Sequence, residues 1–206
     1  MGLKAEFDNF YKNAFGDWEL LHRVFYNFPI GIRFEIGTGY YSDKGETYVK
    51  DAVCRAKTIF AELFDENDDI FLLVNSFEDN PNDLADNDIT TVRPLINHIQ
   101  DECKFTFTSV YDVEFTCERY IIKAAVKDIQ VEKLIEAIAW SDIDRRNSLY
   151  GCVYWVNPRN NIICWLYSDQ GLDVISNKTE NLRHIYIKFN DWILDFDREK
   201  IDATFA

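Results

Sequence analysis

The spacing of apolar positions predicts helices at both ends and in the middle of the chain. The longest expected helix spans about residues 46–64, where apolar side chains recur every three or four positions. The same spacing predicts helices near residues 7–15, 17–24, 91–102 and 131–140. A last helix is expected to start near Asn177 and to carry Trp192 on its apolar stripe, so we expect Trp192 to lie in the core.

Alternating or continuous apolar runs predict strands between these helices. The run at residues 30–36 alternates, and the run at 70–74 is continuous, which is typical of a central strand. Further strands are expected at 105–110, 113–126, 151–156, 162–167 and 172–175. Because the order does not settle into regular βαβ units, we predict an α+β fold, a single domain over residues 1–206. The expected sheet is largely antiparallel, has about five to seven strands, and is covered on one face by helices.

Composition narrows the classes of function. The chain is 47% hydrophobic and 16% aromatic, which is enough for a folded core. It carries 36 acidic against 22 basic residues, for a net charge of −14, and this charge opposes binding to nucleic acid. Apolar runs are too short to span a membrane, and the first ten residues lack the apolar stretch of a signal peptide. We therefore expect a cytoplasmic protein with no membrane contact.

The cysteines and histidines show no spacing that is typical of a metal or catalytic site. The five cysteines are scattered and odd in number, so we predict free thiols. The three histidines form no metal-binding pair, and nothing in the sequence brings Cys164 and His184 together as a dyad. No phosphate-binding or dinucleotide-binding glycine motif occurs, so no metal and no cofactor is expected.

The segment between Lys57 and Arg93 contains ten acidic residues and no basic residue. One interpretation is a docking face for a basic protein partner; another is a site for a divalent cation, although the calcium-loop pattern fails. A third is a pair of solvated loops on either side of a buried strand. If the segment docks a partner, the candidate contact residues are Asp79, Asp83, Asp86 and Asp88.

A second candidate site follows the strand at 162–167. In the turn from Tyr167 to Gly171, we expect Asp169 to accept backbone N–H groups and Gly171 to adopt a positive φ. Farther along, Asp191 and Arg198 would share a helix face if the last helix continued that far. Turn and helix-capping chemistry is sufficient to account for these polar residues, which favours a structural role. A functional role stays open as the alternative.

Residues 150–206 also carry a resemblance to a known family. The stretch Tyr167-Ser168-Asp169-Gln170-Gly171 and the later Asn190-Asp191-Trp192-Ile193-Leu194 resemble the bacterial family called domain of unknown function 3885. The segments at 25–35 and 63–65 are similar to that family as well. Members carry Tyr-Asp-Asp-Arg-Gly at the turn, where this chain has Ser168 and Gln170. The resemblance implies a fold rather than an activity.

Two functions therefore stay open. The first is a non-enzymatic protein-binding domain with an acidic face, similar to the immunity proteins that mask a toxin. The alternative is an enzyme of unknown class with a site around the Tyr167–Gly171 turn, using Asp169, Tyr167 or His184. An enzyme should show a concave site with converging titratable groups, whereas a binding domain should show an exposed face of acidic and aromatic residues.

Overall fold

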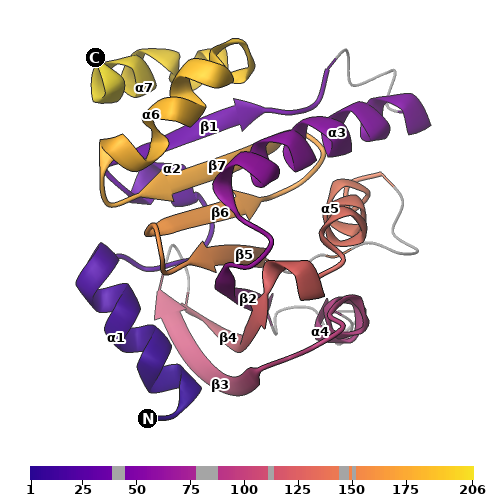
Figure 1. Ribbon diagram of the computed structural model, residues 1–206, viewed down its shortest axis with the longest axis vertical. Helices are drawn as coiled ribbons and strands as arrows, with labels where there is room; N and C mark the ends of the chain where they lie inside the picture. Colours follow the sequence, from indigo (N-terminus) through magenta and orange to yellow (C-terminus); the bar gives the residue numbers. More distant parts are fainter. Residues whose placement is uncertain (39–44, 78–87, 111–113, 144–148, 150–151) are drawn as a thin grey trace.

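A computed structural model describes residues 1–38, 45–77, 88–110, 114–143, 149 and 152–206. Its centre is one seven-stranded sheet in which every neighbouring pair is antiparallel, in the order β1-β7-β6-β5-β2-β4-β3 (Figure 1). The strands are β1 (Gly31–Glu35), β2 (Asp69–Phe77), β3 (Asp101–Val110), β4 (Glu114–Ala125), β5 (Cys152–Asn157), β6 (Ile162–Leu166) and β7 (Gly171–Ser176). The α+β class and the antiparallel sheet are thus confirmed.

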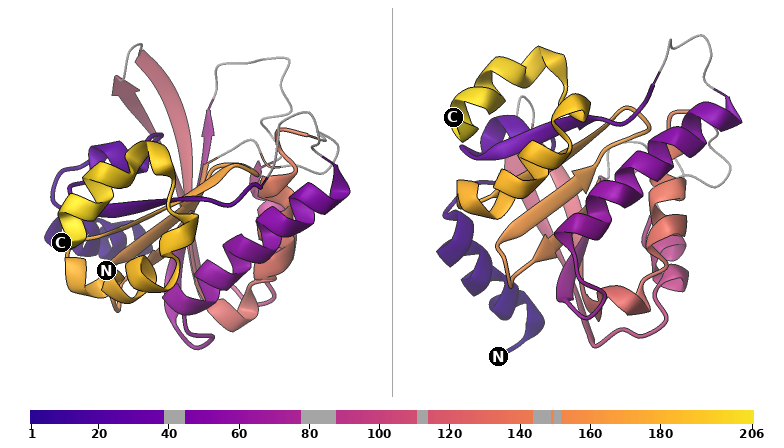
Figure 2. Two further views of the ribbon diagram at one scale, coloured as in Figure 1. Left: turned by 90° about the horizontal axis from the view of Figure 1, so that it is seen from above. Right: turned by 45° about the horizontal axis from the view of Figure 1, so that its top comes forward.

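Helices cover both faces of the sheet, not one as expected. The larger core lies under α3 (Glu46–Leu63), α4 (Asp88–Val92), α5 (Val131–Ala139), α6 (Thr179–Lys188) and α7 (Arg198–Phe205). The smaller core lies under α1 (Leu3–Phe15) and the segment that leads into α2 (Val24–Asn27). Figure 2 shows α3 and α5 together on one side of the strands and α1 on the other.

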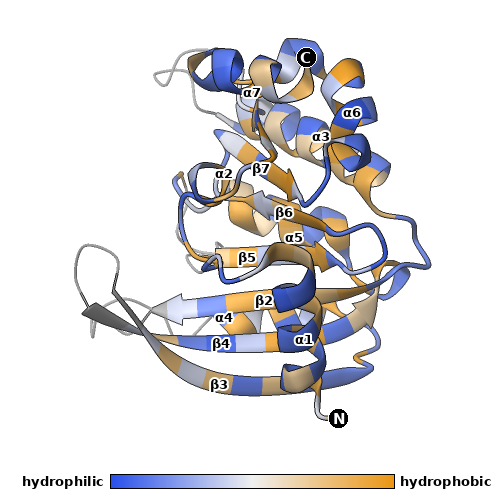
Figure 3. Cartoon of the chain, turned by 90° about the vertical axis from the view of Figure 1, so that its left-hand side faces the viewer, coloured by the Kyte–Doolittle hydropathy of each residue, from blue (hydrophilic) through white to orange (hydrophobic). Residues whose placement is uncertain are grey.

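The second layer arises because β2, β5, β6 and β7 are apolar on both sides. Every residue of β5, β6 and β7 is buried, so each strand needs cover on both faces. Figure 3 shows apolar residues along these central strands. Alternate residues of β2 face opposite cores: Leu72 packs in the larger core and Leu73 in the smaller one.

Two predicted helices differ from the structure. Residues 91–102 form only the end of α4 and a 3₁₀ turn, η3 (Arg93–Leu95), before β3 begins at Asp101. The whole of β3 pairs with β4, and this ladder outweighs the local helical spacing. The segment 17–24 is not a helix either. α1 ends at Phe15 and is followed by Gly16, which has φ of 74°, and buried Leu20 and Leu21 precede α2.

The C-terminal helix is also shorter than predicted. It stops at Lys188 and is followed by two 3₁₀ turns, η6 (Asn190–Trp192) and η7 (Asp195–Asp197), before α7. Trp192 therefore lies at the margin of the larger core, half-buried and stacked on Phe189 with ring centroids 5.0 Å apart. The expectation that Trp192 lies in the core is met only at the core's margin, because the helical stripe does not reach it.

Two further expectations can be compared with the described residues. All five cysteines are free, as predicted. Within the described ranges, none of the helices combines the length and apolar character that crossing a bilayer requires. Another 3₁₀ turn, η4 (Val126–Asp128), joins β4 to α5.

Candidate functional site

Among the described contacts, Ser168 holds the Tyr167–Gly171 turn. The backbone N–H of Gln170 donates to Ser168 Oγ at 3.2 Å, and Ile36 donates to the carbonyl of Gln170 at 3.0 Å. Asp169 is fully buried and lies beside Tyr48 of α3. Burial, together with this carboxylate, raises the pKa of Tyr48 above its usual value. Asp169 thus ties the turn to α3.

Gly171 does not adopt the positive φ predicted for it. It is the first residue of β7 and is extended and buried, paired with Glu35 of β1. A Cβ atom at this position would overlap the hydroxyl of Tyr167. The physical requirement is therefore space for the Tyr167 ring, not a left-handed turn.

A buried charge cluster lies on the α2 side of this turn. Arg33 of β1 bonds both oxygens of Asp173 on β7, at 2.8 and 3.1 Å, and reaches Asp197 of η7 at 3.4 Å. The Phe25 N–H also donates to Asp173 at 3.1 Å. Burial raises the pKa of Asp173, and the hydrogen bonds from Arg33 oppose this rise. The cluster ties β1, α2 and the C-terminal segment together.

A cavity of about 310 Å³ opens beside Tyr167. Its lining includes His22, Arg33, Cys152, Trp165 and Tyr167. Cys152 Sγ lies 3.3 Å from His22 Nδ1. Sequence reasoning missed this pair because 130 residues separate its members. The dyad considered from the sequence does not form: Cys164 is buried in β6, and His184 contacts the carbonyl of Glu62.

The electrostatics of the cavity keep the cysteine and histidine neutral. Burial raises the pKa of the Cys152 thiol to about 12. Burial and the nearby charge of Arg23 lower the pKa of His22. At neutral pH the pair is a thiol beside a neutral imidazole. It therefore lacks the thiolate that a cysteine nucleophile requires.

A larger groove of about 870 Å³ runs between α3 and α5. Both lysines in its lining are already paired: Lys50 with Glu46 at 2.7 Å and Lys57 with Glu132 at 2.5 Å. Of the two other glutamates in the lining, Glu62 pairs with Lys188 at 2.6 Å, which leaves Glu136 as the one acid in excess among these charges.

The C-terminal motif residues take separate roles. Arg198 bonds Asp195 at 2.9 Å and the carbonyls of Asn190 and Ile193 at 3.0 and 3.1 Å. It thus fixes the two 3₁₀ turns. Asp191 is exposed in η6, on the far side of a helix break from Arg198.

The predicted docking acids fall mostly outside the described residues. Asp79, Asp83 and Asp86 lie in the range 78–87, of which nothing is described. Asp88, the first residue of α4, is 5% exposed, so it is not the exposed contact that was expected.

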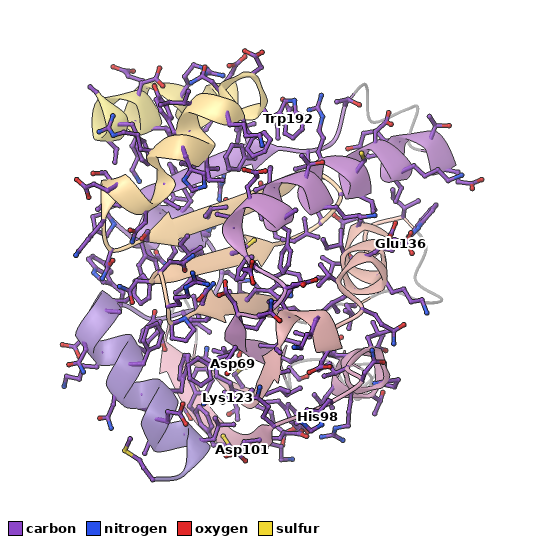
Figure 4. All side chains as sticks on the ribbon, in the orientation of Figure 1. Asp69, His98, Asp101, Lys123, Glu136 and Trp192 are labelled. Carbon is purple, nitrogen blue, oxygen red and sulfur yellow. The ribbon has the colours of Figure 1, made fainter. Side chains whose placement is uncertain are left out.

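The described part of the same acid-rich stretch contributes to a charged end of the sheet, which we call the acidic edge. Gln100, next to Asp101, donates to Asp69 at 2.5 Å, and backbone hydrogen bonds join the 66–68 turn to residues 126 and 127. These contacts bring together the turn before β2, the start of β3 and the segment after β4. Figure 4 labels Asp69, Asp101 and Lys123 at this end of the sheet. The acidic edge consists of Asp65, Glu66, Asp69, Asp101 and Asp128.

The acidic edge has an excess of negative charge. None of its five carboxylates forms an ion pair with the described part of the chain, and four of them are exposed. Two neighbouring cations are paired with acids outside the acidic edge: Lys123 with Glu6 at 2.7 Å, and Arg159 with Asp68 at 2.6 Å. Lys127 bonds the neutral side-chain oxygen of Asn67, so its positive charge offsets one of the five carboxylates and the excess stays negative. No group of three or more His, Cys, Asp or Glu residues in the described ranges is arranged to hold a metal ion.

Comparison with known proteins supports the family resemblance. The family model described as a domain of unknown function, DUF3885, matches residues 7–197. The uncharacterized protein YnaE of Bacillus subtilis (strain 168) is 24% identical over 203 residues, which cover 90% of this chain and 95% of that protein. No solved structure is significantly similar. Because the match spans nearly the whole chain, the protein belongs to the family called domain of unknown function 3885.

Proposed function

We propose that this chain is a non-enzymatic protein-binding domain that docks a basic partner at its acidic edge. The observation that carries the proposal is the gathering of five carboxylates without ion-pair partners at one end of the sheet. Their field attracts a basic surface over about one Debye length, roughly 8 Å at physiological salt. Such a field raises the rate of encounter more than it raises affinity.

A cavity of about 340 Å³ lies next to the acidic edge, and its lining includes Glu62, Asp65, Asp68 and Arg159. Leu63 and Phe64 also line it but are only 3% and 5% exposed, so the accessible surface is mainly polar. A basic side chain of a partner that enters this cavity would meet three carboxylates and one guanidinium.

The chemistry around the Tyr167–Gly171 turn favours this proposal over an enzyme. Burial keeps the Cys152 thiol in the adjacent cavity protonated, and Asp173 is committed to Arg33. Burial also raises the pKa of Tyr167 above its usual value. General acid–base catalysis needs a group whose pKa lies near the working pH. In its specific form, the proposal is an immunity-like role in which the masked partner is a basic toxin.

Site-specific photo-cross-linking tests the proposal. Asn67 lies within the acidic edge and is exposed, so a benzophenone amino acid there keeps all five carboxylates. The matched control places the same amino acid at Ile187, which is 67% exposed on α6 at the other end of the molecule.

In cells of the native host, we expect one basic protein to be cross-linked from position 67 and not from position 187. That yield should fall when Asp65, Asp69 and Asp101 are changed to lysine together. Equal yields of the same proteins from both positions would contradict a docking role for the acidic edge.

A further inference from the structure

A second polar cluster, independent of the acidic edge, is buried between the sheet and α1. Arg119 of β4 is 9% exposed, and its side chain points into the smaller core. Its Nε donates to Asn75 Oδ1 on β2 at 2.7 Å, and its Nη2 donates to the carbonyl of Leu20 at 2.6 Å. The Phe107 ring lies 4.8 Å from the guanidinium carbon.

This guanidinium has no counter-ion in the described part of the chain. Its two hydrogen-bond acceptors are neutral oxygens, and none of the described carboxylates comes within 4.0 Å of its nitrogens. Glu19 is close enough to affect it electrostatically, but Glu19 is exposed. Burial lowers the pKa of Arg119, yet an arginine keeps its proton at neutral pH. A buried charge of this kind is costly unless an opposite charge accompanies it.

Two further donors beside Arg119 lack acceptors. Asn75 Nδ2 and the Tyr154 hydroxyl are both fully buried, and neither has a hydrogen-bond partner among the residues that the structure describes. Asn75 already accepts a hydrogen bond from Arg119 through its side-chain oxygen. On the other side of β2, Asn75 is paired with Cys152 of β5, which is two residues from Tyr154. Tyr154 lies on the same face of the sheet as Arg119 and Asn75, next to the Cys152 thiol, which affects its pKa more than Arg119 does.

We infer that Arg119, Asn75 and Tyr154 form a binding site for one small monovalent anion such as chloride. All three groups donate hydrogen bonds, and they come from the adjacent strands β4, β2 and β5. An anion accepts from all of them and neutralises the single buried positive charge, whereas a water molecule would leave that charge uncompensated. The 9% exposure of Arg119 gives the ion a way in from solvent.

The site selects by charge and by size. Only one full positive charge is present, so a monovalent ion is matched and a divalent phosphate is not. The carbonyl of Leu20 and the Phe107 ring already occupy two sides of the guanidinium, which leaves one side for a compact ligand.

The direct test uses bromide as a probe in crystals of the full chain. We expect an anomalous bromide peak within hydrogen-bond distance of Arg119, Asn75 and Tyr154. Ordinary water density at that position with no bromide peak would overturn the inference.

Solution measurements give a second, independent test. In wild-type protein, the midpoint of thermal unfolding should rise and saturate as chloride replaces gluconate at constant ionic strength. Tyr154→Phe keeps the ring but removes one donor, so the apparent chloride affinity should fall about tenfold. Tyr186→Phe is the matched control, because that hydroxyl bonds Asp202 in the C-terminal helices, and its chloride response should equal that of the wild type.

Arg119→Met should abolish the chloride response if this variant folds. Should it fail to fold, the comparison of Tyr154→Phe with Tyr186→Phe still decides. A midpoint that changes equally in chloride and gluconate, or an unchanged affinity in Tyr154→Phe, would overturn the inference.

Discussion

At Gly171 the absence of a side chain matters more than backbone freedom. The residue is extended within β7, and the Tyr167 hydroxyl occupies the space that a Cβ atom would need. The sequence identified the residue but suggested a different reason for it, because a glycine after a polar turn is usually assigned a positive φ. Only the position of the Tyr167 ring, set by packing on Trp165, shows the actual constraint.

We predict that Gly171→Ala destabilises the fold by about 1–3 kcal/mol, the range for an overpacked core. Urea unfolding measures the change. Gly2→Ala is the control, because no atom lies within 4 Å of a Cβ at Gly2. The double variant with Tyr167→Leu should lose less than the sum of the single changes. If Gly171→Ala is as stable as Gly2→Ala, the packing explanation is wrong.

Asp68 gives a prediction for pH dependence. Burial raises its pKa, but hydrogen bonds from Arg159, the Asp65 N–H and Asn157 outweigh burial and lower it below the usual 3.8. The stability that Asp68 contributes is therefore fully present above about pH 4 and is lost as the pH falls through its lower folded-state pKa. In urea unfolding between pH 6 and pH 2, Asp68→Asn should show a smaller loss of stability than the wild type. Parallel pH curves for the two proteins would contradict this assignment.

At the scale of elements, the C-terminal segment is fastened along the outer edge of β1. Ile193 forms an isolated bridge with Phe34, and Leu194 donates to the Arg33 carbonyl at 2.9 Å. Asp197 then accepts from Tyr26 and Arg33. These contacts come after α6, so the last two turns and α7 depend on long-range partners rather than on helix propensity.

We expect Asp197→Asn to loosen α7 without unfolding the sheet. The amide would lack the charge that Arg33 and Tyr26 now contact, so α7 should open more often. Hydrogen exchange should become faster in residues 198–205 and stay unchanged in β5 and β6. Uniform acceleration through the whole chain would show that the segment is not a separate unit.

The half-buried position of Trp192 leads to a graded prediction. Trp192→Ala should cost about 1–2 kcal/mol, because its ring keeps part of its surface in water, whereas Phe189→Ala should cost about 3–5 kcal/mol as a core truncation. Thermal or urea unfolding of the two variants compares them directly. A larger loss for Trp192→Ala would place the tryptophan in the core after all.

Local spacing predicted most elements but not those that depend on distant partners. The helix at 46–64 and the strands of the last third follow their own periodicity, so the sequence was sufficient to find them. At residues 91–102 the helical spacing is misleading, because backbone groups in this stretch bond distant partners. Ile96 bridges to Ile129, Asn97 donates to Asp128, and the last two residues belong to β3. The His22–Cys152 contact and the Arg119 cluster join residues far apart in the chain, and no local pattern reveals them.

At the scale of the whole molecule, the order of strands determines where the charges gather. The chain starts the sheet with β1 at one edge and places β3 and β4 at the other, so the 65–69 turn, the start of β3 and the end of β4 meet. The sequence showed an excess of acids between residues 57 and 93 but not that Asp101 and Asp128 join them. The acidic edge is thus a product of topology as much as of composition.

The most direct test of the docking proposal is the association rate of the cross-linked partner with charge-reversed variants. One variant carries Asp65→Lys, Asp69→Lys and Asp101→Lys; the control reverses Asp51, Glu180 and Glu199, three exposed acids elsewhere on the surface, so the net charge changes equally. At low salt we predict an association rate at least about tenfold slower for the first variant and within about twofold of wild type for the control, with the difference shrinking at high salt. Equal rates for the two variants at low salt would contradict a docking role for the acidic edge.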